Sequence, residues 1–354
     1  MSLPWSVIWR KAVVSTPRLV PDAVLRFTSP EGPQPLVVKL SSRGTHRIPV
    51  YVFIPPSTQP ASPTSIGLPV LVDFHGGGFV LGSCQEQAPF CAKVCRELEC
   101  VAISVDYRLG PYAQFPAALE DAEDIVNAVI NAEAPGYTEL RNHINDFLKQ
   151  KSRSSIQLNS ARVALSGFSS GGNLALNLVL NINPPQLPEP WPCPFPPDHA
   201  NEIPVLLYYA ALDLRQSPSE REVIEALKDA PKDFSTTLEL EARLVPTYLP
   251  REKAGHLRAS PGLAEIKNGG LHDKARCLVI LAEKDNLHPQ IEAWLEKVIE
   301  EGRGKDMRLE NYLGVSHGYT QFPDSWLDEH SLRTKIITHN EAVDFVREWW
   351  AITD

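Results

Sequence analysis

The segment that most limits the possible folds of this chain is Gly-Phe-Ser-Ser-Gly-Gly, residues 167–172, which joins a strand-like run to a helix-like run. The preceding run, ARVAL (161–165), is short and apolar, whereas NLALNLVLN (173–181) has helical periodicity. Glycines at such a junction let a strand and a helix approach closely through a sharp turn. The turn would lift the hydroxyl of Ser169 above a sheet, at a helix start that stabilises negative charge. The alternative is that the glycines form a purely structural turn and that Ser169 has no catalytic role.

Short apolar runs alternate with helix-like runs along most of the chain. Two β-branched runs joined by a turn come first, at 35–40 and 47–55, and the later strands are continuous and apolar. Strands of the second kind are buried on both faces, so we predict an α/β fold with a mostly parallel central sheet and helices on both faces. The later strands are predicted at 68–74, 101–107, 161–165, 203–210, 275–282 and 307–313, and the helices at 87–99, 115–132, 172–181, 289–302 and 339–350.

Two segments do not fit this alternation and are predicted to form a helical cap. The second of them enters and leaves at the carboxyl ends of predicted strands, where a lid would lie. The predicted organisation is an N-terminal cap segment at 1–30, a first core part at 31–213, a cap insertion at 214–262 and a second core part at 263–354. The apolar residues expected to join the two cap segments are Trp5, Ile8, Trp9, Ile224, Leu227, Leu244 and Tyr248.

Composition argues against several classes of function. The formal net charge of -9 leaves no basic stripe for nucleic acid. Apolar stretches such as 205–212 are too short to cross a bilayer, and the N-terminus lacks the features of a signal peptide. The six cysteines include no Cys-x-x-Cys pair, so we predict no metal site, no cofactor and free, buried thiols. We therefore expect a cytoplasmic monomer or homodimer without integral membrane association.

A second glycine motif, His75-Gly76-Gly77-Gly78-Phe79, directly follows the predicted strand 68–74. Acyl transfer creates an oxyanion, and bare backbone amides are its natural hydrogen-bond donors. Consecutive glycines let the backbone approach a substrate that closely, and this motif pairs with the serine turn in lipases and esterases. His75 could serve as a base, but a buried position beside the loop fits it better.

An activated serine needs a base, and the base needs an orienting carboxylate. Asp285 follows the strand 275–282 and His317 follows the strand 307–313, at the same sheet edge as Ser169 and in the required chain order. Asp213, Glu283 and His288 are competitors for these roles, with structural positions expected instead. Surface positions are expected for His46, His143, His199, His256, His272, His330 and His339.

In these motifs the chain resembles the hormone-sensitive lipase family of α/β-hydrolase esterases and lipases. The resembling pieces are HGGGF (75–79), DYRLGPYAQFPAALED (106–121), GFSSGGN (167–173), YYAALDL (208–214), ASPGLAE (259–265), EKDNL (283–287) and SHGY (316–319). The resemblance implies a nucleophile at Ser169, an acid at Asp285, a base at His317 and a cap. It also implies an oxyanion hole formed by the amides of Gly77, Gly78 and Ser170. The aromatic motif residues predicted to contact substrate are Phe79, Phe168 and Tyr319.

Some positions depart from the family pattern. Phe168 replaces a usual Asp or Thr, Ser170 a usual Ala, and Tyr112 a usual Glu. The acid loop lacks the usual second carboxylate and carries His288 and Pro289 instead. These changes alter the polarity around the predicted triad, so they affect substrate preference more than catalysis.

The function predicted from these features is that of a serine carboxylesterase acting on short-to-medium acyl esters through an acyl-enzyme. The proline-rich loops resemble those of fungal proteins, which suggests a small ester of fungal secondary metabolism as substrate. A lyase, dehydratase or acyltransferase acting on a polyketide or terpenoid could use the same site. A non-catalytic binding protein is a further alternative, although binding relatives have lost the histidine that this chain keeps at 317. A lipase for aggregated lipid is the weakest of these readings.

Overall fold

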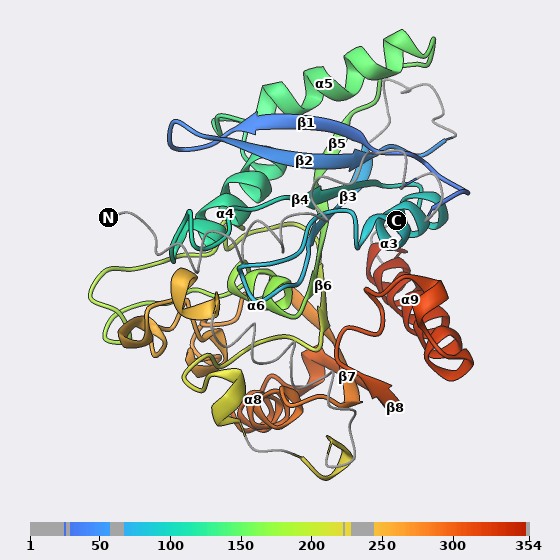
Figure 1. Cartoon of the computed structure of the whole chain (residues 1–354). Coiled ribbons are helices and arrows are strands. Elements are labelled where there is room, and N and C mark those ends of the chain that lie inside the picture. The colour runs from blue at the N-terminus through green and yellow to red at the C-terminus, as the bar shows by residue number, and fades with distance from the viewer. Residues whose placement is uncertain (1–24, 26–28, 57–66, 222–223, 228–243, 352–354) are drawn as a thin grey trace.

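The computed structural model describes residues 25, 29–56, 67–221, 224–227 and 244–351. Its strands are β1 (Leu36–Ser41), β2 (Arg47–Phe53), β3 (Leu68–Phe74), β4 (Val101–Val105), β5 (Leu158–Phe168), β6 (Ile203–Tyr208), β7 (Ala275–Lys284) and β8 (Met307–Ser316). They form one sheet in the order β1-β2-β4-β3-β5-β6-β7-β8 (Figure 1). β1 and β2 pair antiparallel, β2 also runs antiparallel to β4, and all later neighbours are parallel.

Burial of the strands follows this topology. The central strands β4 and β6 are buried along their whole length, as parallel strands covered on both faces must be. The edge strands β1 and β8 alternate between more and less exposed residues. The predicted fold class, a mostly parallel α/β sheet, is therefore confirmed.

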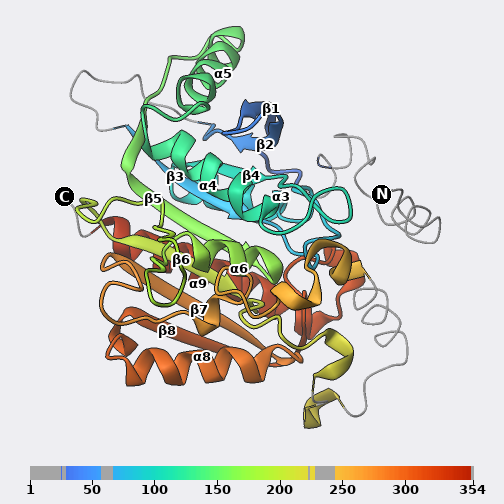
Figure 2. The same ribbon diagram turned by 90° about the vertical axis from the view of Figure 1, so that its left-hand side faces the viewer.

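Helices cover both faces of the sheet. They are α3 (Ala88–Glu97), α4 (Ala117–Ile130), α5 (Tyr137–Gln150), α6 (Ser170–Asn177), α8 (His288–Glu300) and α9 (Glu329–Ala351). α3 and α9 lie together on one face, while α4, α6 and α8 bury their apolar residues on the other (Figures 1 and 2). α5 packs against α4 and β1 at the β1 end of the sheet. Because β5 lies between β3 and β6 in the sheet, the turn from β5 into α6 lies near the middle of the sheet edge.

Two helices differ from the sequence-based expectation. α5 was not predicted, although Leu140, Ile144 and Leu148 recur every four residues and are all buried. α9 begins at Glu329 rather than at residue 339. Its first turns were missed because they carry exposed apolar residues, among them Ile336, which hide the helical pattern in the sequence.

The described parts of the predicted cap insertion consist mostly of short turns. They include 3-10 turns at Pro218–Glu220, Glu225–Leu227, Arg251–Lys253 and Pro261–Leu263. Leu227, Leu244 and Tyr248 are buried and Ile224 is half-buried, but the contact predicted for them involves an N-terminal segment outside the described residues. Trp5, Ile8 and Trp9 lie outside the described residues, so the N-terminal cap segment stays a prediction.

No helix within the described ranges is long and apolar enough to cross a membrane.

Candidate active site

Ser169 occupies a strained turn between β5 and α6. Its backbone has φ 56° and ψ -114°, a combination that residues with a Cβ rarely adopt. The turn depends on the glycines around it: a Cβ on Gly167 would lie 2.1 Å from the carbonyl oxygen of Gly171, and one on Gly171 would lie 2.0 Å from that of Phe74. The amide of Ser169 donates to the carbonyl of Tyr208 at 2.9 Å, which ties the turn to β6. The sequence therefore fixes this serine at the carboxyl edge of the sheet.

A continuous hydrogen-bonded chain joins the three predicted triad residues. His317 Nε2 lies 3.0 Å from Ser169 Oγ, and His317 Nδ1 lies 2.7 Å from Asp285 Oδ2. An ionised carboxylate only accepts, so Nδ1–H donates to Asp285 and leaves Nε2 to accept the Ser169 hydroxyl proton. The second carboxylate oxygen of Asp285 accepts from the Leu287 amide at 2.8 Å. The two hydrogen bonds, one to each carboxylate oxygen, fix the orientation of the buried Asp285 side chain.

His317 is held in place by its neighbours. The backbone amide of His317 donates to the carbonyl of Lys284 at 3.3 Å, which links the ends of β8 and β7. The ring of Tyr209 meets the imidazole edge-to-face with centroids 4.7 Å apart, and its hydroxyl bonds Thr320. These contacts leave the imidazole half-buried with one nitrogen toward Ser169.

The glycine loop after β3 is fixed tightly. Gly77 has φ 116° and Gly78 has φ 60°, and a Cβ on Gly77 would lie 2.3 Å from the carbonyl oxygen of Leu81. His75 is buried and stacks on Tyr107 with ring centroids 4.2 Å apart, while the Tyr107 hydroxyl donates to the His75 carbonyl at 2.7 Å. His75 therefore supports the loop from behind.

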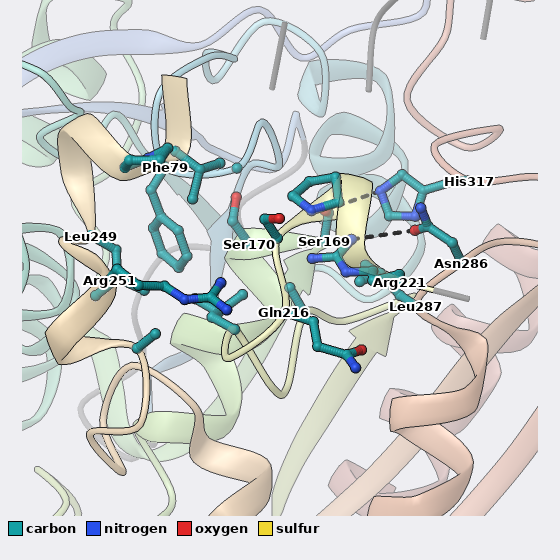
Figure 3. A pocket seen from close by; sticks show the side chains of 18 of the residues that line it. Phe79, Ser169, Ser170, Gln216, Arg221, Leu249, Arg251, Asn286, Leu287 and His317 are labelled. Atoms are coloured by element: carbon teal, nitrogen blue, oxygen red, sulfur yellow. Dashed lines mark hydrogen bonds between the residues drawn. The ribbon is translucent and has the colours of Figure 1, made fainter. Parts of the chain in front are cut away.

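A cavity of about 240 Å³ opens in front of Ser169 (Figure 3). Its lining includes Gly78, Ser169, Ser170 and His317, and most of its remaining wall is apolar. The apolar lining residues are Phe79, Ala211, Leu214, Pro218, Val245, Pro246, Leu249, Ala254, Leu287 and Phe322. Several of these come from the predicted cap insertion, which therefore forms one wall of the cavity.

The structure brings one of the three predicted substrate-contacting aromatics to this cavity. Phe79 lines it and stacks on Tyr248, with ring centroids 4.7 Å apart. Phe168 instead points into the core, stacked on Tyr208 at 4.1 Å. Tyr319 is also buried, with its hydroxyl 2.7 Å from that of Thr338. Neither Phe168 nor Tyr319 is among the residues that line the cavity.

The competing acids and bases have structural partners. The Asp213 carboxylate accepts from the guanidinium of Arg215, and Glu283 accepts from the amide of Gly314 at 2.7 Å. The ring Nδ1 of His288 lies 3.1 Å from the carbonyl oxygen of Ala282. His199, His272 and His339 are buried rather than at the surface as expected. The ring of His339 packs near Phe90 and Tyr208, and burial lowers its pKa to about 3.

Several polar residues of the cavity wall were not predicted from the sequence. Gln216, Arg221 and Arg251 come from the predicted cap insertion, which carries no recognisable motif, and Asn286 follows Asp285 directly. Asn286 alone could have been found from its neighbour in the chain. The other three lie on an irregular segment, so their position at the cavity could not be inferred from a local sequence pattern.

Asp73 forms a buried polar cluster below the glycine loop. Its carboxylate accepts from Ser166 at 2.6 Å and from Ser104 at 3.0 Å, which joins β3 to β5 and β4. Burial raises the pKa of Asp73 to about 7, against the hydrogen bonds that lower it.

The described residues hold no group of three or more His, Cys, Asp or Glu side chains placed to bind a metal. None of the six cysteines forms a disulfide bond, and all six are buried, as predicted.

The chain is similar to known proteins in sequence and in fold. The sequence profile of the alpha/beta hydrolase fold matches residues 71–321. The chain is 26% identical over 272 residues to an AB hydrolase superfamily protein of Schizosaccharomyces pombe, which covers 76% of this chain and 67% of that protein. It is 35% identical over 131 residues to a 3-O-acetylpapaveroxine carboxylesterase of Papaver somniferum, covering 36% of this chain. That alignment spans 39% of the poppy enzyme's length.

Among solved structures, one of two fungal esterases from Rhizomucor miehei superposes with a TM-score of 0.67 at 25% identity. That superposition covers 99% of this chain and 92% of the fungal esterase. The profile match covers well over half of the chain and includes Ser169, Asp285 and His317. The chain therefore belongs to the α/β-hydrolase fold family, among the esterases that resemble hormone-sensitive lipase.

Proposed function

We propose that this protein is a serine carboxylesterase that hydrolyses short-to-medium acyl esters through an acyl-enzyme on Ser169. The observation that carries the proposal is the chain of hydrogen bonds from Asp285 through His317 to Ser169 beside a largely apolar cavity. A nucleophile within reach of a base, and a base oriented by a carboxylate, are the parts that acyl transfer requires.

In the acylation step, the Ser169 hydroxyl proton moves to His317 Nε2 as Oγ bonds to the ester carbonyl carbon. The carbonyl π electrons move onto the oxygen and form a tetrahedral oxyanion. Asp285 holds His317 in the tautomer that accepts this proton and stabilises the imidazolium that results.

The oxyanion is assigned to the backbone amides of Gly77, Gly78 and Ser170. The Ser170 amide is the first of α6, and the first amides of a helix have no partner within the helix. The start of a helix also favours negative charge, and Gly78 and Ser170 both line the cavity. Removing one donor from a site of this kind typically costs about 3–4 kcal/mol of transition-state stabilisation.

Collapse of the intermediate breaks the bond to the alcohol oxygen, which takes the proton from His317. Water then enters, gives a proton to His317 and attacks the acyl carbon. Ser169 regains its proton as the free acid departs, so no cofactor takes part in the cycle.

The size and lining of the cavity support small ester substrates. The poppy relative is named for an acetyl ester, which makes acetates suitable first probes. An ester of fungal secondary metabolism stays a prediction, as does the monomeric or homodimeric state. Six buried thiols, none of them in a disulfide bond, support the proposal of a reducing compartment such as the cytoplasm.

The test is the hydrolysis of p-nitrophenyl acetate and butyrate by the wild-type protein and by Ser169→Ala, with the free acid identified as a product. Turnover that depends on Ser169 and releases the acid supports the proposal. Transfer of the acyl group to another acceptor without acid release would indicate an acyltransferase. A folded Ser169→Ala variant that keeps most of the activity would rule out the mechanism.

A further inference from the structure

A second, much smaller space lies beside the cavity in front of Ser169. Its volume is about 10 Å³, which is room for about one water molecule. Phe79, Leu214 and Leu249 line both this second space and the catalytic cavity. A side chain that lines two spaces lies between them, so these three residues form a dividing wall.

The second space is buried and mostly apolar. Apart from the dividing wall, its apolar lining residues are all buried, and they are Phe115, Leu119, Leu174, Tyr248 and Ala259. Its polar lining residues, Asn173 and Arg258, donate to the backbone carbonyls of Ala211 and Asn177, each at 2.7 Å. A space with such a lining suits hydrocarbon better than water.

Backbone hydrogen bonds hold the aromatic part of this region in place. The stacked rings of Phe79 and Tyr248 belong to residues whose carbonyls both accept an amide from the segment between β4 and α4. Gly110 donates to Phe79 and Phe115 donates to Tyr248, each at 2.9 Å. The dividing wall is therefore a fixed feature of the cavity.

Leu249 is the best-fixed aliphatic residue of the wall. It directly follows Tyr248, its amide donates to the carbonyl of Val245 at 2.9 Å, and its side chain is buried. Leu214, by contrast, is only half-buried. Leu249 thus closes the catalytic cavity toward the second space.

The wall faces the part of the cavity where the acyl chain of an ester would lie. His317 must deliver its proton to the leaving alcohol, so the alcohol lies on the side of His317 and the acyl chain extends away from it. Figure 3 shows Phe79 and Leu249 on the opposite side of Ser169 from His317. An acyl chain on Ser169 therefore grows toward the dividing wall.

We propose that Leu249 determines the longest acyl chain that the enzyme accepts, by closing the catalytic cavity toward the second space. The second space is then the direction in which a longer chain would continue if the wall were opened. The inference rests on the proposed esterase function and names a residue that sets its acyl preference.

The kinetic test opens the wall with Leu249→Ala. The substrates are p-nitrophenyl butyrate and octanoate, and the measured quantity is the ratio of kcat/KM for octanoate to that for butyrate. We expect the variant to raise this ratio roughly 10-fold over the wild type, because each newly buried methylene contributes roughly fourfold. A folded Leu249→Ala variant that leaves the ratio unchanged overturns the inference.

Leu257→Ala is the matched control for a general loosening of this region. Leu257 is a half-buried leucine of the same predicted cap insertion, and it lines neither of the two spaces. Its truncation should leave the ratio at the wild-type value. An equal rise in Leu249→Ala and Leu257→Ala contradicts the role assigned to the wall.

Filling the second space should cancel the effect of opening the wall. Ala259 lines the second space but not the catalytic cavity, so Ala259→Val added to Leu249→Ala should bring the ratio back toward the wild type. Leu119→Phe fills the same space from α4 and replaces Ala259→Val if thermal melts show that the latter double variant does not fold. A raised ratio that persists in a folded, filled variant means that the chain extends elsewhere and overturns the inference.

A binding measurement separates this inference from the proposed function. Ser169→Ala is titrated with N-(4-nitrophenyl)butanamide and N-(4-nitrophenyl)octanamide, with and without Leu249→Ala in the same chain. A gain in affinity for the octanamide relative to the butanamide on opening the wall supports the inference, whatever the turnover of the wild type. An unchanged preference contradicts it, even if butyrate is hydrolysed and the esterase function stands.

Discussion

His317 Nε2 lies 3.0 Å from Ser169 Oγ, although 148 residues separate the two along the chain. Each lies at the carboxyl end of a strand, Ser169 after β5 and His317 after β8. Parallel strands bring all such ends to one edge of the sheet, so the contact follows from the topology.

Replacing Asp285 by Asn should keep the shape of the site but favour the wrong tautomer of His317. We expect kcat to fall by roughly 10³- to 10⁴-fold on p-nitrophenyl butyrate with little change in melting temperature. The double variant with Ser169→Ala should be no worse than Ser169→Ala alone, because the three residues act as a unit. Additive losses in the double variant would show that Asp285 acts outside the triad.

Replacing Gly77 by Ala should distort the loop assigned to the oxyanion, because the new Cβ would lie 2.3 Å from the Leu81 carbonyl oxygen at a φ of 116°. We expect kcat/KM to fall at least about 100-fold, as on loss of an oxyanion donor. Gly269→Ala is the control: it also has positive φ, but nothing lies within 4 Å of its Cβ position. The control should lose about 1–2 kcal/mol of stability and no activity, and equal kinetic losses in both variants would contradict the assignment.

Phe79 and Phe168 should respond differently to truncation. Phe79 lines the cavity, so Phe79→Ala should raise kcat/KM for bulky acyl esters relative to acetate by several-fold. Phe168 packs on Tyr208 in the core, so Phe168→Leu should lower the free energy of unfolding by about 1–2 kcal/mol and leave acyl preference unchanged. The measurement is a series of p-nitrophenyl esters alongside urea unfolding. If Phe168→Leu changed the acyl preference and Phe79→Ala did not, the result would support the prediction that Phe168 contacts substrate.

The buried carboxyl of Asp73 should make stability depend on pH. Burial raises its pKa from an ordinary value of 3.8 to about 7 in the folded protein. Between these values the unfolded chain has released the proton and the folded protein still holds it, so the free energy of unfolding falls as pH rises. The fall is on the order of 4 kcal/mol in total and ends near the folded pKa.

Asp73→Asn has no proton to lose and should remove this decline. We expect the variant to gain most in melting temperature over the wild type at about pH 8 and least at about pH 4.5. Thermal melts across this range provide the measurement. Parallel curves for the two proteins would mean that Asp73 does not titrate in this window.

Much of the fold, and the meeting of Ser169, Asp285 and His317, could be predicted from the sequence because local patterns specify them. The strand before Ser169, the glycines around it and the helix after it are contiguous, and the order of Ser169, Asp285 and His317 follows from strand ends. α5 was missed because its polar residues conceal the spacing of Leu140, Ile144 and Leu148.

Other features depend on contacts that no local pattern records. Phe168 adjoins Ser169 in the chain, yet alternation along β5 turns its ring into the core and away from the cavity. Arg221 and Arg251 reach the cavity through an irregular segment whose path depends on the packing of residues such as Tyr248 against Phe79. Sequence reasoning cannot place side chains on such a segment.

The most direct test of the central claim is intact-protein mass spectrometry after rapid quenching with p-nitrophenyl butyrate, followed by peptide mapping. The account predicts a transient mass increase of one butyryl group, located on Ser169, that is absent in Ser169→Ala and accumulates when deacylation is slowed. Turnover of the ester with no acyl group on Ser169 at any quench time, or an acyl group on another residue, would contradict it.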